Sequence, residues 1–168
     1  MARIERRTLL FLSAGALIAA GGRPQTARAQ AVDPILLTVH GVGRLQVMRL
    51  ADLDALPQQK FTTSTIWTTT ETEFSGPALV EVLELSGLLG QPLRLKAAND
   101  YSIQLPPQMI ETMAPIVATR INGQTFGLRD RGPLWLVFPY DADSRFRTER
   151  TFAASIWQLT DIRADDAP

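Results

Sequence analysis

The sequence predicts an α+β fold, mostly β, in a single domain. Three observations lead to this prediction. Short segments rich in apolar, β-branched or threonine residues recur along the chain, and turn signals separate them, as is typical of strands. One segment has the 3.6-residue periodicity of a longer helix. The chain contains no internal repeat, linker or low-complexity tract that would divide it into smaller domains.

The first 29 residues have the pattern of a secretory signal peptide. Three arginines among the first seven residues precede an uncharged, mostly apolar run over 9–20 and a small-x-small sequence at 27–29. The apolar run is shorter than the roughly 20 residues that span a bilayer. We expect residues 1–29 to be removed, which leaves a periplasmic domain of residues 30–168 with no membrane insertion. The pattern does not distinguish Sec from twin-arginine export.

Charge and cysteine content exclude several classes of function. Residues 1–29 hold five of the 17 basic and one of the 17 acidic residues, which leaves 12 basic and 16 acidic groups beyond them, a net charge of −4. A mildly acidic domain without a basic cluster is a poor match for nucleic acid or an anionic membrane surface. The sequence has no cysteine, which excludes disulfides, lipid-modified cysteine anchors, thiolate nucleophiles and cysteine-bound metals.

The first part of the domain predicts a strand, a helical turn and an extended segment. Ile35–Val39 is apolar and β-branched and is expected to be the first strand. Asp52 is placed to cap a short helical turn over Leu53–Leu56, which Pro57 ends. The threonine-rich segment Phe61–Thr70 favours an extended chain over a helix.

The clearest helix follows Ser75-Gly76-Pro77. Proline suits the first position of a helix, where its missing N–H has no intrahelical partner to lose. Leu79, Val82 and Leu83 share one face at helical spacing, and Gly87 is a typical residue for the C-terminal end.

Turn signals locate the later strands. Asn99-Asp100 predicts a tight turn, Asn122-Gly123 is a strong hairpin signal, and Arg131-Gly132-Pro133 precedes a continuous apolar run. A helical turn is expected within Pro107–Met113, and the polar segment Asp141–Arg150 is expected to be a loop. The strands are predicted at Leu93–Ala97, Tyr101–Leu105, Ile116–Arg120, Gln124–Phe126, Leu134–Phe138 and Ser155–Ile162, with a frayed end over Ala164–Pro168.

The sequence lacks the residue patterns of the common catalytic sites. His40 is the single histidine and no nucleophile motif accompanies it, so a Ser-His-Asp triad is not indicated. The carboxylates lack the spacing of a calcium-binding loop, and Gly41-Val42-Gly43 is too short for a phosphate loop. We therefore expect no catalytic residues and no metal site.

Aromatic and charged side chains beside turns form the candidate ligand site. Flat side chains stack on a flat ligand, while arginine and aspartate hydrogen-bond to its edge. Trp135, like Trp157 in the last strand, is equally compatible with a core position, and a charged run such as the one over 129–131 is most often a solvated turn. The residues predicted to bind a ligand are Trp67, Tyr101, Arg129, Asp130, Arg131, Trp135 and Tyr140.

Four segments resemble, in order and spacing, the sulfite-oxidase-type molybdopterin-binding fold. Glu73–Leu79 is similar to the aromatic-x-Gly helix start of that family, and Ala98–Tyr101 is similar to its aspartate-glycine-tyrosine turn. Asn122-Gly123 and the run Arg-Gly-Pro-Leu-Trp-Leu-Val-Phe-Pro over 131–139 resemble its later hairpin and its glycine-proline strand. The resemblance covers roughly Val39 to Ile162 and implies this fold for the whole domain.

The sequence departs from the enzymes of that family at the metal and at the phosphate end of the cofactor. Those enzymes hold molybdenum through a cysteine, which would lie near Ser64, and no residue within 62–67 is a thiol. A serine hydroxyl is a poor substitute because its pKa disfavours the anion that a metal ligand must be. Arg131 and Trp135 take the places of a histidine and an arginine that hold the phosphate, and an indole cannot neutralise a phosphate.

This pattern resembles a group of small periplasmic pterin-binding proteins that keep the fold but lack the cysteine. Arg129–Trp135 and Ser155–Leu159 are the most similar segments. The resemblance implies a non-catalytic sensor that binds a metal-free pterin, with Trp67 and Tyr101 stacking on the ring and Asp130 and its neighbouring arginines at the polar edge. It also implies a partner, the periplasmic domain of a membrane signalling protein such as an enzyme that makes or degrades cyclic di-GMP.

Two other functions are compatible with the sequence. One is a molybdopterin-dependent oxidoreductase that retains a molybdenum cofactor through Ser64 or without a protein ligand. The other is an interaction module whose pocket has decayed, for which the sequence offers no positive support.

Overall fold

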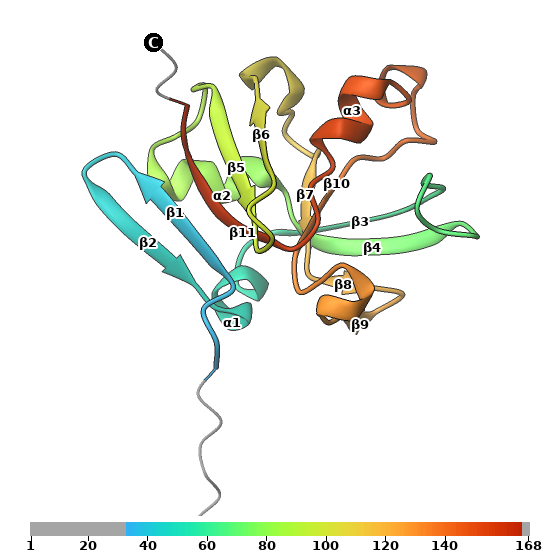
Figure 1. The fold of residues 1–168 in the computed structure, drawn as a ribbon, viewed down its shortest axis with the longest axis horizontal. Coiled ribbons are helices and arrows are strands. Elements are labelled where there is room, and N and C mark those ends of the chain that lie inside the picture. Colours follow the sequence, from blue (N-terminus) through green and yellow to red (C-terminus); the bar gives the residue numbers. More distant parts are fainter. Residues whose placement is uncertain (1–32, 166–168) are drawn as a thin grey trace, which may run out of the picture. The chain divides into compact units, whose positions relative to one another are not determined.

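The computed structural model describes residues 33–165, which fold into three sheets and three short helices (Figure 1). This arrangement confirms the predicted fold class, α+β and mostly β. The predicted signal peptide over 1–29 lies outside the described residues. Within 33–165, none of the helices is long and apolar enough to cross a membrane.

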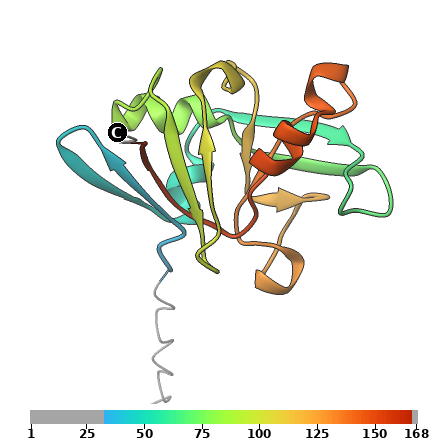
Figure 2. The same cartoon turned by 45° about the horizontal axis from the view of Figure 1, so that its top comes forward.

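The largest sheet has five strands in the order β2-β1-β11-β5-β6. The first strand, β1 (Leu37–Gly41), pairs in parallel with the last, β11 (Leu159–Ala164), so the two ends of the domain meet inside this sheet (Figure 2). The other neighbours in the sheet are antiparallel. These are β2 (Arg44–Met48), β5 (Leu93–Ala97) and β6 (Ser102–Leu105).

Two further sheets complete the β structure. One has four antiparallel strands in the order β3-β4-β8-β9, and its β3–β4 hairpin extends away from the β1–β2 hairpin (Figure 1). The other pairs β7 with β10, and every residue of both strands is buried, so this pair lies in the hydrophobic core. The strands are β3 (Gln58–Thr63), β4 (Thr72–Pro77), β7 (Ile116–Ala118), β8 (Arg120–Ile121), β9 (Gln124–Thr125) and β10 (Trp135–Val137).

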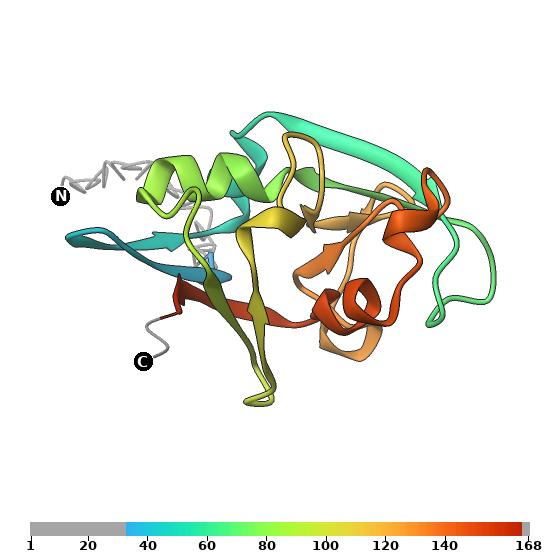
Figure 3. The same ribbon diagram turned by 90° about the horizontal axis from the view of Figure 1, so that it is seen from above.

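The longest helix, α2 (Leu79–Ser86), packs its apolar face into the core. Leu79, Val82 and Leu83 are fully buried, as their spacing predicts, and the helix lies against β1 (Figure 3). Gly87 ends the helix at φ 73°, a left-handed conformation that glycine adopts at little cost. The other helices are α1 (Leu50–Asp54) and α3 (Glu149–Ala154), with 3-10 turns η1 (Pro107–Met109), η2 (Leu128–Asp130) and η3 (Ser144–Phe146).

Two strands, β2 and β4, were not predicted from the sequence. The segment that forms β4 ends in Gly76-Pro77, which was expected to start a helix. A Cβ atom on Gly76 would lie 2.1 Å from the carbonyl oxygen of Val117, so glycine is required there for β4 to pass close to β7. Helix α2 therefore begins at Leu79, two residues after Pro77.

The segment Phe61–Thr70 is a strand only as far as Thr63, which corrects the prediction of a continuous extended chain. Residues 64–70 form turns that Thr65 organises. Its Oγ1 accepts hydrogen bonds from the backbone N–H of Trp67 at 3.0 Å and of Thr68 at 2.9 Å. A threonine hydroxyl that caps backbone donors in this way competes with strand pairing, and it places Trp67 in a loop.

Two other segments differ from prediction. Asp52 does not precede α1 but lies within it, where its carboxylate accepts from the backbone N–H of Arg49 at 2.8 Å. The polar segment 141–150 holds η3 and the start of α3, which the Thr148 hydroxyl caps by accepting from the Thr151 N–H at 3.1 Å.

The C-terminal strand begins later than expected and ends in an anchored residue. Residues 155–158 are irregular, and β11 starts at Leu159. The Asp165 carboxylate accepts from Arg94 Nε at 2.9 Å, so this part of the predicted frayed end is fixed in place. Residues 166–168 lie outside the described residues.

Candidate functional site

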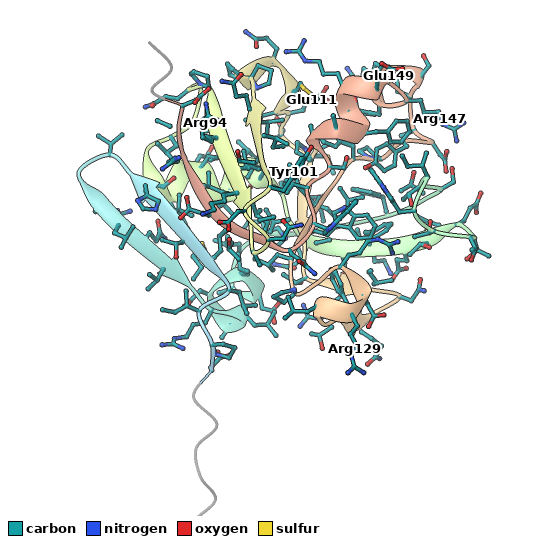
Figure 4. The ribbon with its side chains drawn as sticks, viewed as in Figure 1. Arg94, Tyr101, Glu111, Arg129, Arg147 and Glu149 are labelled. Carbon is teal, nitrogen blue, oxygen red and sulfur yellow. The ribbon has the colours of Figure 1, made fainter. Side chains whose placement is uncertain are left out.

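A cavity of about 400 Å³ opens between the loop over 64–70, the turn from β5 to β6, and the end of α3 with the residues after it. Aromatic and aliphatic side chains make up most of its wall, and Tyr101 lies in the middle of the molecule in Figure 4. The residues that line it are Ile66, Trp67, Ala97, Asn99, Tyr101, Phe152, Ala153, Ser155, Ile156 and Trp157.

Trp67 is the centre of the aromatic wall. Its ring centroid lies 5.5 Å from that of Trp157, 5.7 Å from Trp135 and 5.9 Å from Phe152, each pair in edge-to-face geometry. Edge-to-face pairs are favourable because the positive edge of one ring meets the negative face of the other. The ring of Trp67 is therefore held in one orientation even though it belongs to a loop.

Two residues with unusual backbone angles position Trp157. Gln158 has φ 54° and Arg131 has φ 69°, and the N–H of Gln158 donates to the carbonyl of Arg131 at 3.1 Å. The Arg131 guanidinium lies 5.8 Å from the ring centroid of Trp157 and 5.7 Å from that of Trp135. For residues other than glycine, a left-handed backbone conformation costs free energy and persists only where the surrounding structure enforces it. These contacts fix the wall formed by Trp157.

Ser64, at the start of the 64–70 loop, is tied to Asp141 and Arg147. The Asp141 carboxylate accepts from the backbone N–H of Ser64 and from Ser64 Oγ, the latter at 2.8 Å, and it forms an ion pair with Arg147. Arg147 also donates from Nη2 to Ser64 Oγ and from Nε to the carbonyl of Tyr140, both at 3.1 Å. This network fastens the loop that carries Trp67 to the segment after β10.

These contacts lower the pKa of Asp141, and burial raises the pKa of Tyr140. Hydrogen bonds from the backbone and hydroxyl of Ser64, followed by the bond from Arg147, lower the pKa of Asp141 from 3.8 to about 2. Burial raises the pKa of Tyr140 to about 12, so its hydroxyl stays protonated at neutral pH and bonds to Ser155 Oγ.

A second cavity, of about 290 Å³, adjoins the first. The two cavities share Ile66 and Phe152 in their walls. The second is more polar in its lining, which consists of Ser64, Thr65, Ile66, Tyr140, Arg147 and Phe152.

Two of the residues predicted to bind a ligand, Trp67 and Tyr101, line the first cavity. Tyr101 is 52% exposed, which leaves much of its ring free for contact. Their role in binding stays a prediction. Tyr140 is buried and its ring stacks on Phe152 at 5.0 Å, so it borders only the second cavity.

Trp135, also predicted to bind a ligand, lies in the core and lines neither cavity. It is 1% exposed, and its ring contacts Phe74 at 5.4 Å in addition to Trp67 and Trp157. Its Nε1 donates to the carbonyl of Ser155 at 3.3 Å. Trp135 therefore supports the cavity wall from beneath.

The charged run over 129–131, predicted to form the polar edge of the site, lines neither cavity. Arg129 and Asp130 are exposed on η2, and Figure 4 shows Arg129 far from both Tyr101 and Arg147. Arg131 lies against the indoles of Trp135 and Trp157, outside the cavity lining.

Sequence reasoning missed several wall residues. Phe152 lies just after the segment Asp141–Arg150, which was expected to be a loop, and Ser64 was considered only as a replacement for a metal ligand. Arg147 gave no signal because one arginine among several in a charged stretch is not distinctive. The capping signal at Thr148 would have placed α3, and with it Phe152, on the side of the cavity.

The residues near Ser64 do not fit a molybdenum ion. Ser64 Oγ donates to Asp141 and accepts from Arg147, so this hydroxyl is already engaged, and the Asp141 carboxylate, with a pKa of about 2, is too weak a base to hold it as an anion. Within 33–165, no three histidine or carboxylate side chains gather where they could hold a metal, and the sequence has no cysteine.

Comparison with known proteins defines the fold. No protein-family model matches the sequence, and no curated protein matches it. Fifteen chains of known structure match, and the fold is that of the sulfite-oxidase-like molybdopterin-binding proteins, as the four sequence motifs predict. One match is the sulfane dehydrogenase SoxCD from Paracoccus pantotrophus, with a TM-score of 0.60 and 17% identity. The match covers 78% of this chain and 38% of that chain, so the shared part spans well under half of the dehydrogenase chain.

Proposed function

We propose that this protein is a non-catalytic periplasmic binding protein whose ligand is a metal-free pterin. One observation carries the proposal: the 400 Å³ cavity is walled by Trp67, Tyr101, Phe152 and Trp157, on a fold whose metal-ligand position holds a serine already engaged in hydrogen bonds. Aromatic walls of this kind suit a flat ring, which gains by burying both of its faces.

The polar groups around the cavity suit the edge of such a ring. Within the described residues, no hydrogen bond is formed by Nε1 of Trp67 or Trp157, in contrast to Nε1 of Trp135. The side chain of Asn99 also lines the cavity, and its amide offers both donors and acceptors. A pterin carries donors and acceptors along its edge, so these groups support a pterin over an aliphatic ligand.

The likeness to the sulfane dehydrogenase concerns the fold alone, and in this proposal the fold serves a different function. Function depends on the site rather than on the fold. The site near Ser64 has lost the chemistry of a metal ligand, while the aromatic cavity beside it is well formed. This combination supports binding without redox catalysis.

We further propose that ligand occupancy is passed to the periplasmic domain of a membrane signalling protein, such as an enzyme that makes or degrades cyclic di-GMP. This part of the proposal rests on the sequence resemblance to small periplasmic pterin-binding proteins. Co-precipitation of such a partner in the presence and absence of pterin tests it, and equal capture in both conditions would contradict ligand-dependent signalling.

Fluorescence titration of the mature protein, residues 30–168, with pterin tests the proposed ligand. Trp67→Ala is expected to weaken binding by at least about tenfold, because it removes the central ring of the wall. Arg129→Ala is the control, since Arg129 is exposed on η2 and lines neither cavity. Unchanged affinity in a folded Trp67→Ala protein would show that the ligand binds elsewhere.

A further inference from the structure

We infer that the second cavity, beside Ser64 and Arg147, receives a carboxylate-bearing substituent of the ring held in the aromatic cavity. The inference rests on the proposed function and names the kind of pterin that fits best. It follows from how the two cavities adjoin and from which hydrogen-bonding groups are left free.

The two cavities are close enough for one ligand to reach both. Ile66 and Phe152 belong to both walls, so the two cavities meet at these side chains. The volumes, about 400 and about 290 Å³, suit a fused ring in the first and a short substituent in the second.

The acceptors of Thr65 in the second cavity and of Asp141 beside it already receive hydrogen bonds from the protein. The Asp141 carboxylate receives hydrogen bonds from the Ser64 N–H, from Ser64 Oγ and from Arg147. Thr65 Oγ1 receives the N–H groups of Trp67 and Thr68. A ligand group that donates hydrogen bonds therefore finds few partners here.

Donors remain on Arg147. Its Nε bonds to the carbonyl of Tyr140 and its Nη2 bonds to Ser64 and Asp141, while Nη1 forms no hydrogen bond with the described residues. The guanidinium is planar and always charged, and its hydrogen bonds to a carboxylate are charge-assisted. The free side of this group favours an anionic acceptor such as a carboxylate.

Arg147 is also positioned before a ligand arrives. Three protein groups hold its guanidinium, so less side-chain entropy is lost on binding than for a mobile arginine. Asp141 neutralises part of the charge, which limits the gain. We expect a preference of about tenfold for a carboxylate-bearing ring over a neutral ring of the same size.

Arg145 provides a matched control. It lies two residues before Arg147, is 59% exposed, and pairs with Glu111 and Asp143. It lines neither cavity. Replacing either arginine with methionine removes the same charge and keeps a similar stem, so the difference between the two variants isolates the position.

The experiment compares 6-carboxypterin, 6-methylpterin and unsubstituted pterin by fluorescence titration of the wild-type mature protein, Arg147→Met and Arg145→Met. The wild type and Arg145→Met should bind 6-carboxypterin about tenfold more tightly than 6-methylpterin. Arg147→Met should lose this preference, so that the ratio of its dissociation constants for 6-methylpterin and 6-carboxypterin falls to about one.

Equal wild-type affinity for the carboxylated and methylated rings would overturn the inference without any variant. A preference that survives in Arg147→Met would overturn it as well. If pterin itself fails to bind the wild type, the proposed function fails, and that outcome is distinct from pterin binding without a carboxylate preference.

Discussion

At the scale of the residue, the three tryptophans occupy one cluster but have different surroundings. Trp135 is enclosed by Phe74 and the other two indoles, whereas Trp67 and Trp157 present part of their rings to the cavity. Core aromatic residues contribute to stability mainly by filling volume. A partly exposed aromatic ring contributes less to stability and keeps part of its surface free for contact with a ligand.

This difference predicts the effect of truncating Trp135. Trp135→Ala should lower the free energy of unfolding by about 3–5 kcal/mol, because it leaves a large void under the cavity wall. Tyr101→Ala, at a side chain that is 52% exposed, should change it by about 0.5 kcal/mol or less. Urea unfolding of both variants measures this, and similar losses in the two would contradict the division between core and wall.

Asp141 predicts a dependence of stability on acid pH. Its pKa is about 2 in the folded protein against an ordinary 3.8, so its contribution is complete above about pH 4 and is lost as the pH falls toward 2. Asp141→Asn removes that contribution. The melting temperature of the variant should therefore be lower than that of the wild type at neutral pH, and the gap should narrow below about pH 4. A gap that stays constant down to pH 3 would show that Asp141 has no lowered pKa.

At the scale of the element, β4 passes so close to β7 that one added methyl group would disrupt their packing. A Cβ atom on Gly76 would meet the carbonyl oxygen of Val117 at 2.1 Å, a contact between two backbones that cannot rotate away. Gly76→Ala should destabilise the protein by about 1–3 kcal/mol or more. Gly127→Ala is the control, because a Cβ there meets open space and its φ is −97°. Equal unfolding midpoints for the two variants would contradict this packing.

Elements that depend on local chemistry could be predicted from the sequence. Asn122 and Gly123 have φ 49° and 75°, as a tight hairpin requires, and they join β8 to β9. Gly87 ends α2 as expected. These residues determine the backbone through their own side chains, or through the lack of one.

Elements that depend on distant contacts could not be predicted in the same way. Gly76-Pro77 has the local signals of a helix start, but its strand pairing is decided by β3, β8 and the carbonyl of Val117. The site follows the same rule. Trp67 and Tyr101 were predicted as aromatic residues beside turns, while Arg147 joins the site only because Asp141 holds it against Ser64.

At the scale of the whole molecule, the fold resembles that of an enzyme, whereas the candidate site suits binding without metal chemistry. The chain shares its fold with a sulfane dehydrogenase at 17% identity, yet the position near Ser64 offers no metal ligand of the kind molybdenum needs. The network of Ser64, Asp141 and Arg147 instead holds a loop whose tryptophan forms a cavity wall. On this account, the fold is kept as a scaffold for binding a ring.

The central claim, that the protein binds a pterin without metal, is tested most directly by what co-purifies with the mature protein from cells supplied with molybdate. The account predicts a fluorescent pterin, identified by mass spectrometry, with molybdenum far below one atom per chain in the same sample. Molybdenum at one atom per chain would contradict the account and would identify the protein as a molybdopterin-dependent oxidoreductase.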